Sequence, residues 1–137
     1  MIESAFAHRF TGEWVRAWNQ HDIDAVLTQC SEDLELIVSH GASAGTPLRG
    51  KRRVGAHWAR VLTPPSLTVS LSLFIEPIVI AVGIDSVTLI HEDRGRRGAQ
   101  TFHFDRDGLV KQAVMFRRAR RIPGPCDACL LYTSPSP

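Results

Sequence analysis

FHFDRDGLVKQAVMF, from Phe102 to Phe116, has the pattern of two strands joined by a tight turn. Phe102 and Phe104 alternate with polar neighbours, which is the period of a half-buried strand. The segment 105–108 (DRDG) has turn chemistry, because an Asp side chain bonds its own backbone and glycine adopts positive φ without steric cost. The residues at 110–117 alternate again. We therefore predict a β-hairpin here, which carries no chemistry by itself.

Other alternating segments precede this hairpin. Residues 67–73, 78–84 and 85–93 have the period of strands, and an earlier strand is predicted at 34–39. Pro77 interrupts the series, which predicts a bulge or an edge strand because proline cannot donate to a strand ladder. Short turns between the later strands favour an antiparallel arrangement.

Three helices are predicted, at residues 3–20, 23–30 and 51–62, and Asp22 is expected to cap the second. The first helix carries bulky aromatic residues at every fourth position, a stripe that either belongs to the core or contributes a tryptophan to a ligand cavity. Helices that come first and antiparallel strands that follow predict an α+β fold, with helices packed on one face of a curved sheet. The stripe consists of Phe6, Phe10, Trp14 and Trp18.

Length and composition narrow the class of protein. The 137 residues suffice for one domain, and a net charge of +2 with interspersed signs argues against a nucleic-acid or membrane partner. No apolar run reaches the roughly 20 residues that span a bilayer, and no secretory signal is evident, so a cytoplasmic protein is expected. We assign residues 1–118 to the domain and 119–137 to a disordered or foreign tail, because the latter lack periodicity.

The cysteines and basic residues give no clear site. Cys30 is expected to be a small buried hydrophobe, whereas the CxxC formed by Cys126 and Cys129 lacks a second ligand pair. We therefore predict no metal and no cofactor. A basic cluster at the start of the third helix is either a solvated rim or an anion-attracting mouth to a pocket, and its members are Arg49, Lys51, Arg52 and Arg53.

Three motifs in this order resemble the nuclear transport factor two-like superfamily, and best its SnoaL-like polyketide cyclases and ketosteroid-isomerase-like proteins. They are FTGEWVRAWNQHDIDAVLTQCSEDLEL at 10–36, LRGKRRVGAHWARVL at 48–62, and the hairpin at 102–116. The resemblance covers about residues 3–118. It implies a cone-shaped α+β barrel, in which three N-terminal helices pack on a strongly curved antiparallel sheet around a deep apolar pocket. It also implies dimers joined through the outer face of the sheet.

The resemblance does not imply one activity, because the superfamily contains isomerases, cyclases, hydratases, epoxide hydrolases and non-catalytic binding domains. At the positions of the ketosteroid isomerase Tyr, Asp base and Asp acid, this chain has Trp14, Val38 and Gln100. Steroid isomerisation by that mechanism is therefore disfavoured. The epoxide-hydrolase mechanism needs an Asp-Arg-Asp set, and no inward carboxylate pair with an Arg is evident. It stays open, since a one-residue register slip reverses every face.

Other polar residues are candidates for a pocket. We predict His40 or His57 as proton acceptor, because histidine titrates near neutral pH, and Gln100 as the group that polarises a substrate carbonyl. His91 and His103 are expected on the surface of their strands. The predicted substrate-binding residues are mostly apolar: Trp14, Trp18, Val38, Trp58, Phe102 and Met115.

Two classes of function remain open from the sequence. The first is a cofactor-free isomerase, cyclase or hydratase that uses histidine as acid or base on an apolar organic molecule. The second is a non-catalytic small-molecule-binding or dimerisation domain. A homodimer is expected in either case.

Overall fold

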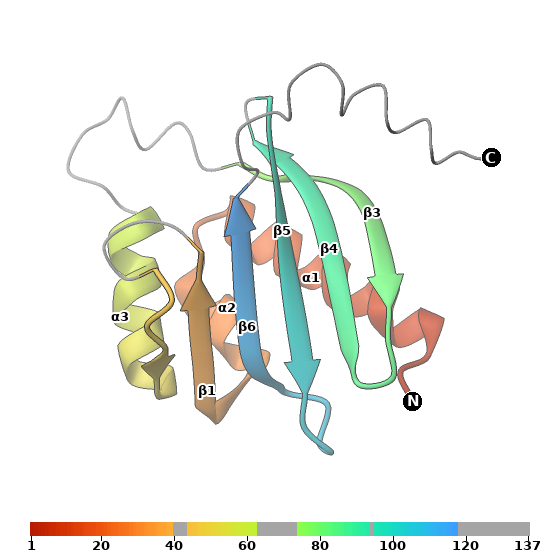
Figure 1. Cartoon of the computed structure of the whole chain (residues 1–137), viewed down its shortest axis with the longest axis horizontal. Coiled ribbons are helices and arrows are strands. Elements are labelled where there is room, and N and C mark those ends of the chain that lie inside the picture. The colour runs from red at the N-terminus through yellow and green to blue at the C-terminus, as the bar shows by residue number, and fades with distance from the viewer. Residues whose placement is uncertain (40–43, 63–73, 94, 118–137) are drawn as a thin grey trace.

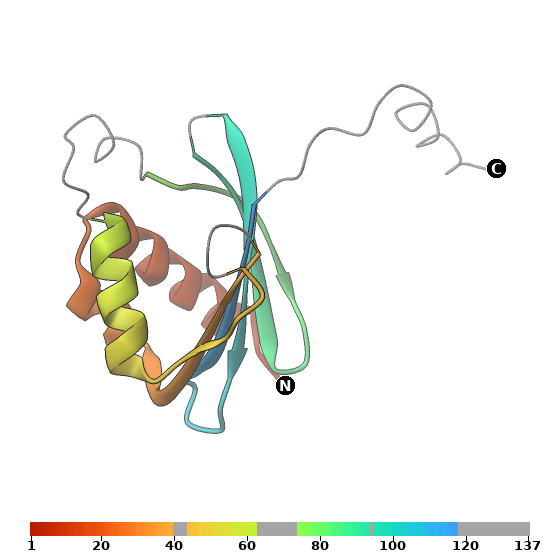
Figure 2. The same cartoon turned by 60° about the vertical axis from the view of Figure 1, so that its left-hand side comes forward.

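The protein is described from a computed structural model of the chain, and the described residues are 1–39, 44–62, 74–93 and 95–117. In this part of the chain, three helices cover one face of a six-stranded sheet (Figures 1 and 2). The described helices include none that is long and apolar enough to cross a membrane. The elements are α1 (Ser4–Asn19), α2 (Ile23–Thr28), β1 (Cys30–Val38), β2 (Leu48–Arg49), α3 (Lys51–Leu62), β3 (Glu76–Val82), β4 (Ser86–Asp93), β5 (Arg96–Phe104) and β6 (Val110–Arg117).

The α+β prediction is confirmed, and the sheet is curved and open, in the order β2-β1-β6-β5-β4-β3. One detail differs, because β1 pairs with β6 in parallel and the sheet is therefore mixed. The reason is topological: no tight hairpin joins β1 to β6, so local turn chemistry does not set their relative direction. The predicted strand at 67–73 and the predicted tail at 119–137 lie outside the described residues, so the domain boundary stays a prediction.

The turn chemistry of the hairpin is confirmed. Gly108 has a φ of 81°, a conformation that favours glycine. The Asp105 Oδ1 atom accepts hydrogen bonds from the backbone N–H groups of Asp107 at 2.9 Å and Leu109 at 3.0 Å. Pro77 behaves as predicted as well, since it lies at a register shift in β3, which is an edge strand.

The aromatic stripe of α1 lies against the sheet. Phe10 and Trp14 are buried, and their ring centroids lie 4.9 Å and 4.6 Å from that of Phe102 on β5. Trp58 on α3 contacts Trp14 edge-on at 5.6 Å. These edge-to-face contacts are favourable beyond the burial of area, because the positive ring edge meets the negative face. The stripe therefore holds α1 and α3 on the sheet.

Asn19, the last residue of α1, fastens the helix to the edge of the sheet. Its Nδ2 donates to the Ile75 carbonyl oxygen at 2.9 Å, and its Oδ1 accepts from the Ile75 N–H at 2.7 Å. The side chain thus takes the place of a neighbouring strand just before β3 begins. Helix α2 follows closely. The Asp22 Oδ1 atom accepts a hydrogen bond from Ala25 N at 3.1 Å and caps this helix, as predicted.

Replacement of Asn19 by Ala should lower the free energy of unfolding by about 1–3 kcal/mol, because both backbone groups of Ile75 lose their partner. Urea denaturation measures this difference. Gln20→Ala is the matched control, since Gln20 is exposed at the same helix end. Equal stability of the two variants would contradict a fastening role for Asn19.

Candidate functional site

The helix-facing side of the sheet brings several predicted site residues into one row. Val38 on β1 pairs with Met115 on β6, Met115 pairs with Gln100 on β5, and Gln100 pairs with Leu89 on β4. Directly paired residues of neighbouring strands share a face, so the row runs across the sheet. Gln100 is the only polar member of this row, and it is 4% exposed.

The predicted aromatic walls form a close-packed cluster next to this row. Trp14, Trp58 and Phe102 are at most 1% exposed, and Trp18 is 5% exposed. Trp18 also contacts Trp58 edge-on, with ring centroids 5.8 Å apart. These residues are therefore part of the core, and their contact with a ligand stays a prediction.

A chain of hydrogen bonds crosses this apolar interior. The Trp14 Nε1 atom donates to Gln100 Oε1 at 3.0 Å, and the Gln100 Nε2 atom lies 3.2 Å from His91 Nε2 on β4. Trp14 and Gln100, two of the three positions that the resemblance was expected to match with ketosteroid isomerase residues, are thus in direct contact. Gln100 makes the buried connection between α1 and β4.

The hydrogen-bond chain determines which ring nitrogen of His91 carries the proton. The indole N–H can only donate, so the atom of Gln100 that faces Trp14 is the oxygen and the atom that faces His91 is the NH₂ group. The His91 Nε2 atom must then accept. Burial lowers the pKa of His91 from its ordinary 6.5, an effect that the charge of Asp93 partly offsets. The ring is therefore neutral at pH 7 with its proton on Nδ1.

Sequence reasoning missed His91 as an inward residue. Two polar atoms at this end of β4, His91 Nδ1 and Asp93 Oδ1, are buried without a hydrogen-bond partner in the structure as described. The alternation of β4 held the signal: Val87 and Leu89 are buried, and His91 and Asp93 continue the same face at two-residue steps. The expectation of a surface position overlooked this parity.

The structure says less about the two histidines that were predicted as proton acceptors. His57 is half-buried on α3, and burial, followed by the charge of Arg60, lowers its pKa. His40 lies outside the described residues. Their role in a site stays a prediction.

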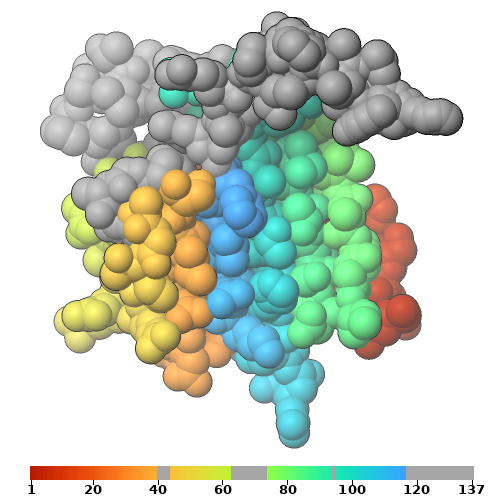
Figure 3. All heavy atoms as spheres, viewed as in Figure 1, coloured from red at the N-terminus to blue at the C-terminus, as the bar shows by residue number. Residues whose placement is uncertain are grey.

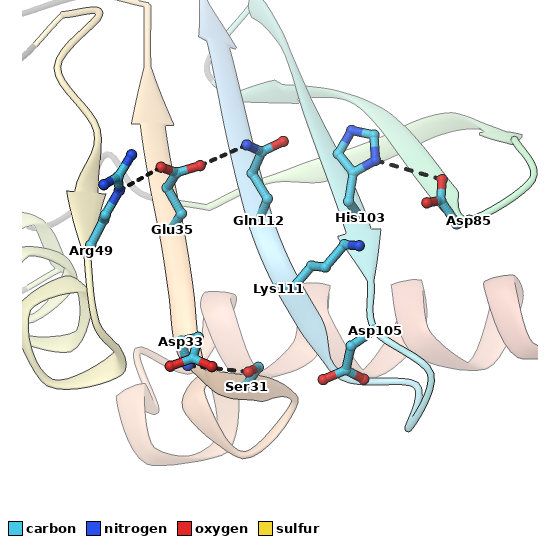
Figure 4. A pocket seen from close by; sticks show the side chains of 9 residues that line it. All are labelled: Ser31, Asp33, Glu35, Arg49, Asp85, His103, Asp105, Lys111 and Gln112. Carbon is cyan, nitrogen blue, oxygen red and sulfur yellow. Dashed lines mark hydrogen bonds and ion pairs between the residues drawn. The ribbon is translucent and has the colours of Figure 1, made fainter.

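The opposite face of the sheet carries an open groove of about 560 Å³. Figure 3 shows this face, which the helices do not cover, and Figure 4 shows the residues that line the groove. Glu35 accepts hydrogen bonds from Gln112 and Arg49 at 2.8 Å each, and these bonds lower its pKa. His103 Nδ1 lies 3.7 Å from Asp85 Oδ1. The described groove is thus polar and on the other face from the predicted apolar pocket.

One member of the basic cluster, Arg49, lines this groove, and the other three begin α3. Arg49 pairs with Glu35, Lys51 lies 3.8 Å from Glu32, and both Arg52 and Arg53 are exposed. The solvated-rim interpretation fits these positions.

Cys30 is a buried structural thiol, as predicted. It is 1% exposed, its Sγ donates to the Val26 carbonyl oxygen at 3.5 Å, and burial raises its pKa to about 12. A thiol that stays protonated is a poor nucleophile and metal ligand. Among the described residues, no group of three or more His, Cys, Asp or Glu side chains is arranged to hold a metal ion.

We expect His91 to show the Nδ1–H tautomer and a pKa below 6.5 in ¹H–¹⁵N NMR spectra of the imidazole rings, with His91→Gln used to assign the signal. Because the pKa of His91 is lower in the native protein than in the unfolded chain, the unfolded chain binds more protons below pH 6.5, and stability decreases as the pH falls from 6.5 through the pKa of the native state. His103 on the outer face is the control histidine. An Nε2–H tautomer at His91 would contradict the hydrogen-bond chain.

Comparisons with solved structures show where this arrangement belongs. A SnoaL-like protein of unknown function from Burkholderia thailandensis is 33% identical, with a TM-score of 0.76 over 87% of this chain and 100% of that chain. A nuclear transport factor two-like protein of unknown function from Mesorhizobium loti is 15% identical, with a TM-score of 0.68 over 87% and 96% of the two chains. A candidate ketosteroid isomerase from Kribbella flavida is 13% identical, with a TM-score of 0.65 over 88% and 84%. The latter two show the fold alone.

No curated protein matches the sequence. The SnoaL-like domain model, however, matches residues 12–113, which is most of the described fold. This match and the Burkholderia relative agree with the helix order, the sheet and the hairpin described above. The chain therefore belongs to the SnoaL-like domain family.

Proposed function

We propose that this SnoaL-like domain binds a small, largely apolar organic molecule on the helix-facing side of the sheet, beside Gln100 and His91. The observation that carries the proposal is the buried Trp14–Gln100–His91 chain beside the aromatic cluster. Burying a polar group without a partner costs roughly 1–3 kcal/mol, and His91 Nδ1 at the end of this chain is buried without one in the structure as described. A few polar groups converging in apolar surroundings are typical of ligand sites.

The chemistry that fits this site is cofactor-free proton transfer, as in an isomerisation, cyclisation or hydration. His91 can take part as a hydrogen-bond donor to a substrate oxygen, because its proton lies on Nδ1 and its Nε2 is engaged by Gln100. His57, whose pKa is lowered by burial, is the candidate base, since a neutral imidazole can take up a proton from a substrate. The isomerase residues Tyr, Asp and Asp are replaced here, so the proposal does not include the ketosteroid mechanism.

A non-catalytic binding domain is the alternative. It is supported by the engagement of His91 Nε2 with Gln100, which leaves one ring nitrogen for a ligand. In that case the same residues orient a ligand without turnover.

Ligand-observed NMR with apolar carbonyl, lactone and alcohol compounds tests the proposed binding. Replacement of Gln100 by Leu should weaken binding at least about tenfold, since the amide orients both Trp14 and His91. His103→Ala on the outer face is the matched control and should bind as the wild type does. Equal weakening by both variants, or none by either, would contradict a site at Gln100; turnover of a bound compound would separate the enzyme from the binding domain.

We also propose that the chain forms a homodimer through the outer face of the sheet. Above the polar groove this face exposes large apolar side chains, among them Val79 at 55% and Phe116 at 46%. Val79 pairs with Ile90, and Phe116 pairs with Ala99, so the apolar surface extends across four strands. A self-complementary patch of this kind suits an isologous, two-fold interface.

Phe116→Glu should shift the protein from dimer to monomer, because it places a charge within the proposed apolar interface. Size-exclusion chromatography with light scattering measures the mass. Val61→Glu introduces the same charge at an exposed apolar position of α3, on the helix side, and should leave the dimer intact. A wild-type monomer at high concentration would refute the assembly.

A further inference from the structure

Two residues on the same face of β4 each have a buried polar side-chain atom without a partner in the structure as described. The atoms are His91 Nδ1 and Asp93 Oδ1, and within the described part of the chain neither is hydrogen-bonded. His91 and Asp93 are two residues apart on one strand, so their side chains share the helix-facing side. The charge of Asp93 raises the pKa of His91, although burial lowers it more.

The protons of this pair are determined by the hydrogen-bond chain behind it. Trp14 orients the Gln100 amide, the amide NH₂ faces His91 Nε2, and His91 therefore presents N–H at Nδ1. An ionised Asp carboxylate only accepts. The pair thus offers one donor and one acceptor.

A single atom that satisfies both groups must accept one hydrogen bond and donate another. A hydroxyl oxygen does this. A ketone or an ether accepts from His91 but has nothing to donate to Asp93, and a carboxylate ligand is repelled by the Asp93 charge. The geometry therefore selects among oxygen-bearing ligands.

The neighbouring strand leaves room for the imidazole. His91 pairs with Gly98 on β5, and a Cβ at Gly98 would lie 3.0 Å from His91 Cε1 and 3.4 Å from His91 Nε2. It would also lie 2.9 Å from the Phe116 carbonyl oxygen. Glycine at this position allows the ring to stay against Gln100 with Nδ1 directed elsewhere.

We propose that His91 and Asp93 form a hydroxyl-binding pair, and that the ligand of this domain is an alcohol or enol whose oxygen accepts from His91 Nδ1–H and donates to Asp93. This inference rests on the proposed function, because it specifies the ligand of the same site. It makes Asp93 a specificity-determining residue that neither the sequence patterns nor the family match indicates.

The test compares ligands that differ in one oxygen group. Cyclohexanol, cyclohexanone and methoxycyclohexane, together with their 4-tert-butyl analogues, are titrated against the protein, and the His91 ring signals report the dissociation constants. The wild type should bind the alcohols about tenfold or more tightly than the ketones and ethers, which is the discrimination expected of hydrogen bonds to a charged group. Asp93→Ala should abolish this preference.

Asp85→Ala is the matched control, since Asp85 also lies near a histidine, His103, but on the outer face. It should keep the full preference for alcohols. If Asp93→Ala does not fold, as thermal unfolding would reveal, Asp93→Asn keeps the side-chain shape and should reduce the preference.

The outcomes separate the two proposals. Ketones and ethers that bind as tightly as alcohols, with binding still lost in Gln100→Leu, would overturn the hydroxyl pair and leave the proposed site intact. A preference for alcohols that persists in both Asp93 variants would also overturn the role of Asp93. Failure of every compound in both series to bind would overturn both proposals.

Discussion

The hydrogen bond from the Trp14 indole to the Gln100 oxygen is the interaction on which the interior depends. It joins α1 to the centre of the sheet inside an aromatic cluster, where a lost partner is costly because no water replaces it. It also sets the direction of the Gln100 amide. That direction determines which nitrogen of His91 carries the proton. One contact in the core thus sets the tautomer of a histidine near the end of β4.

The two faces of the sheet have different physical characters. The helix-facing side is mostly apolar, and the Trp14–Gln100–His91 chain crosses it. The outer side is divided between a polar groove and an apolar area around Val79 and Phe116. The SnoaL-like fold by itself assigns no activity, so a function has to be inferred from the residues on these surfaces. We propose ligand binding at the first face and assembly through the second.

The stretch that links α1 to α2 illustrates how a motif that marks a family can have a structural basis. Trp18 is in the core, Asn19 holds the backbone of Ile75, and Asp22 caps the next helix. His21 between them has a φ of 57°, which turns the chain sharply between the two helices. Each of these roles concerns the path of the chain. The residues of the buried hydrogen-bond chain other than Trp14, which are Gln100 and His91, lie elsewhere, on the strands.

The sequence by itself determined the features that short-range patterns encode. These include the three helices, the cap at Asp22, the turn at 105–108, the bulge at Pro77 and the burial of the aromatic stripe. It also placed Gln100 on the face shared with Phe102, because alternation within one strand needs no knowledge of its partners. Tertiary structure decided the parallel pairing of β1 with β6 and the contact between Trp14 and Gln100, which are 86 residues apart. It likewise decided that His91 reaches Gln100, since a histidine at a strand end is buried only when neighbouring strands and helices cover it.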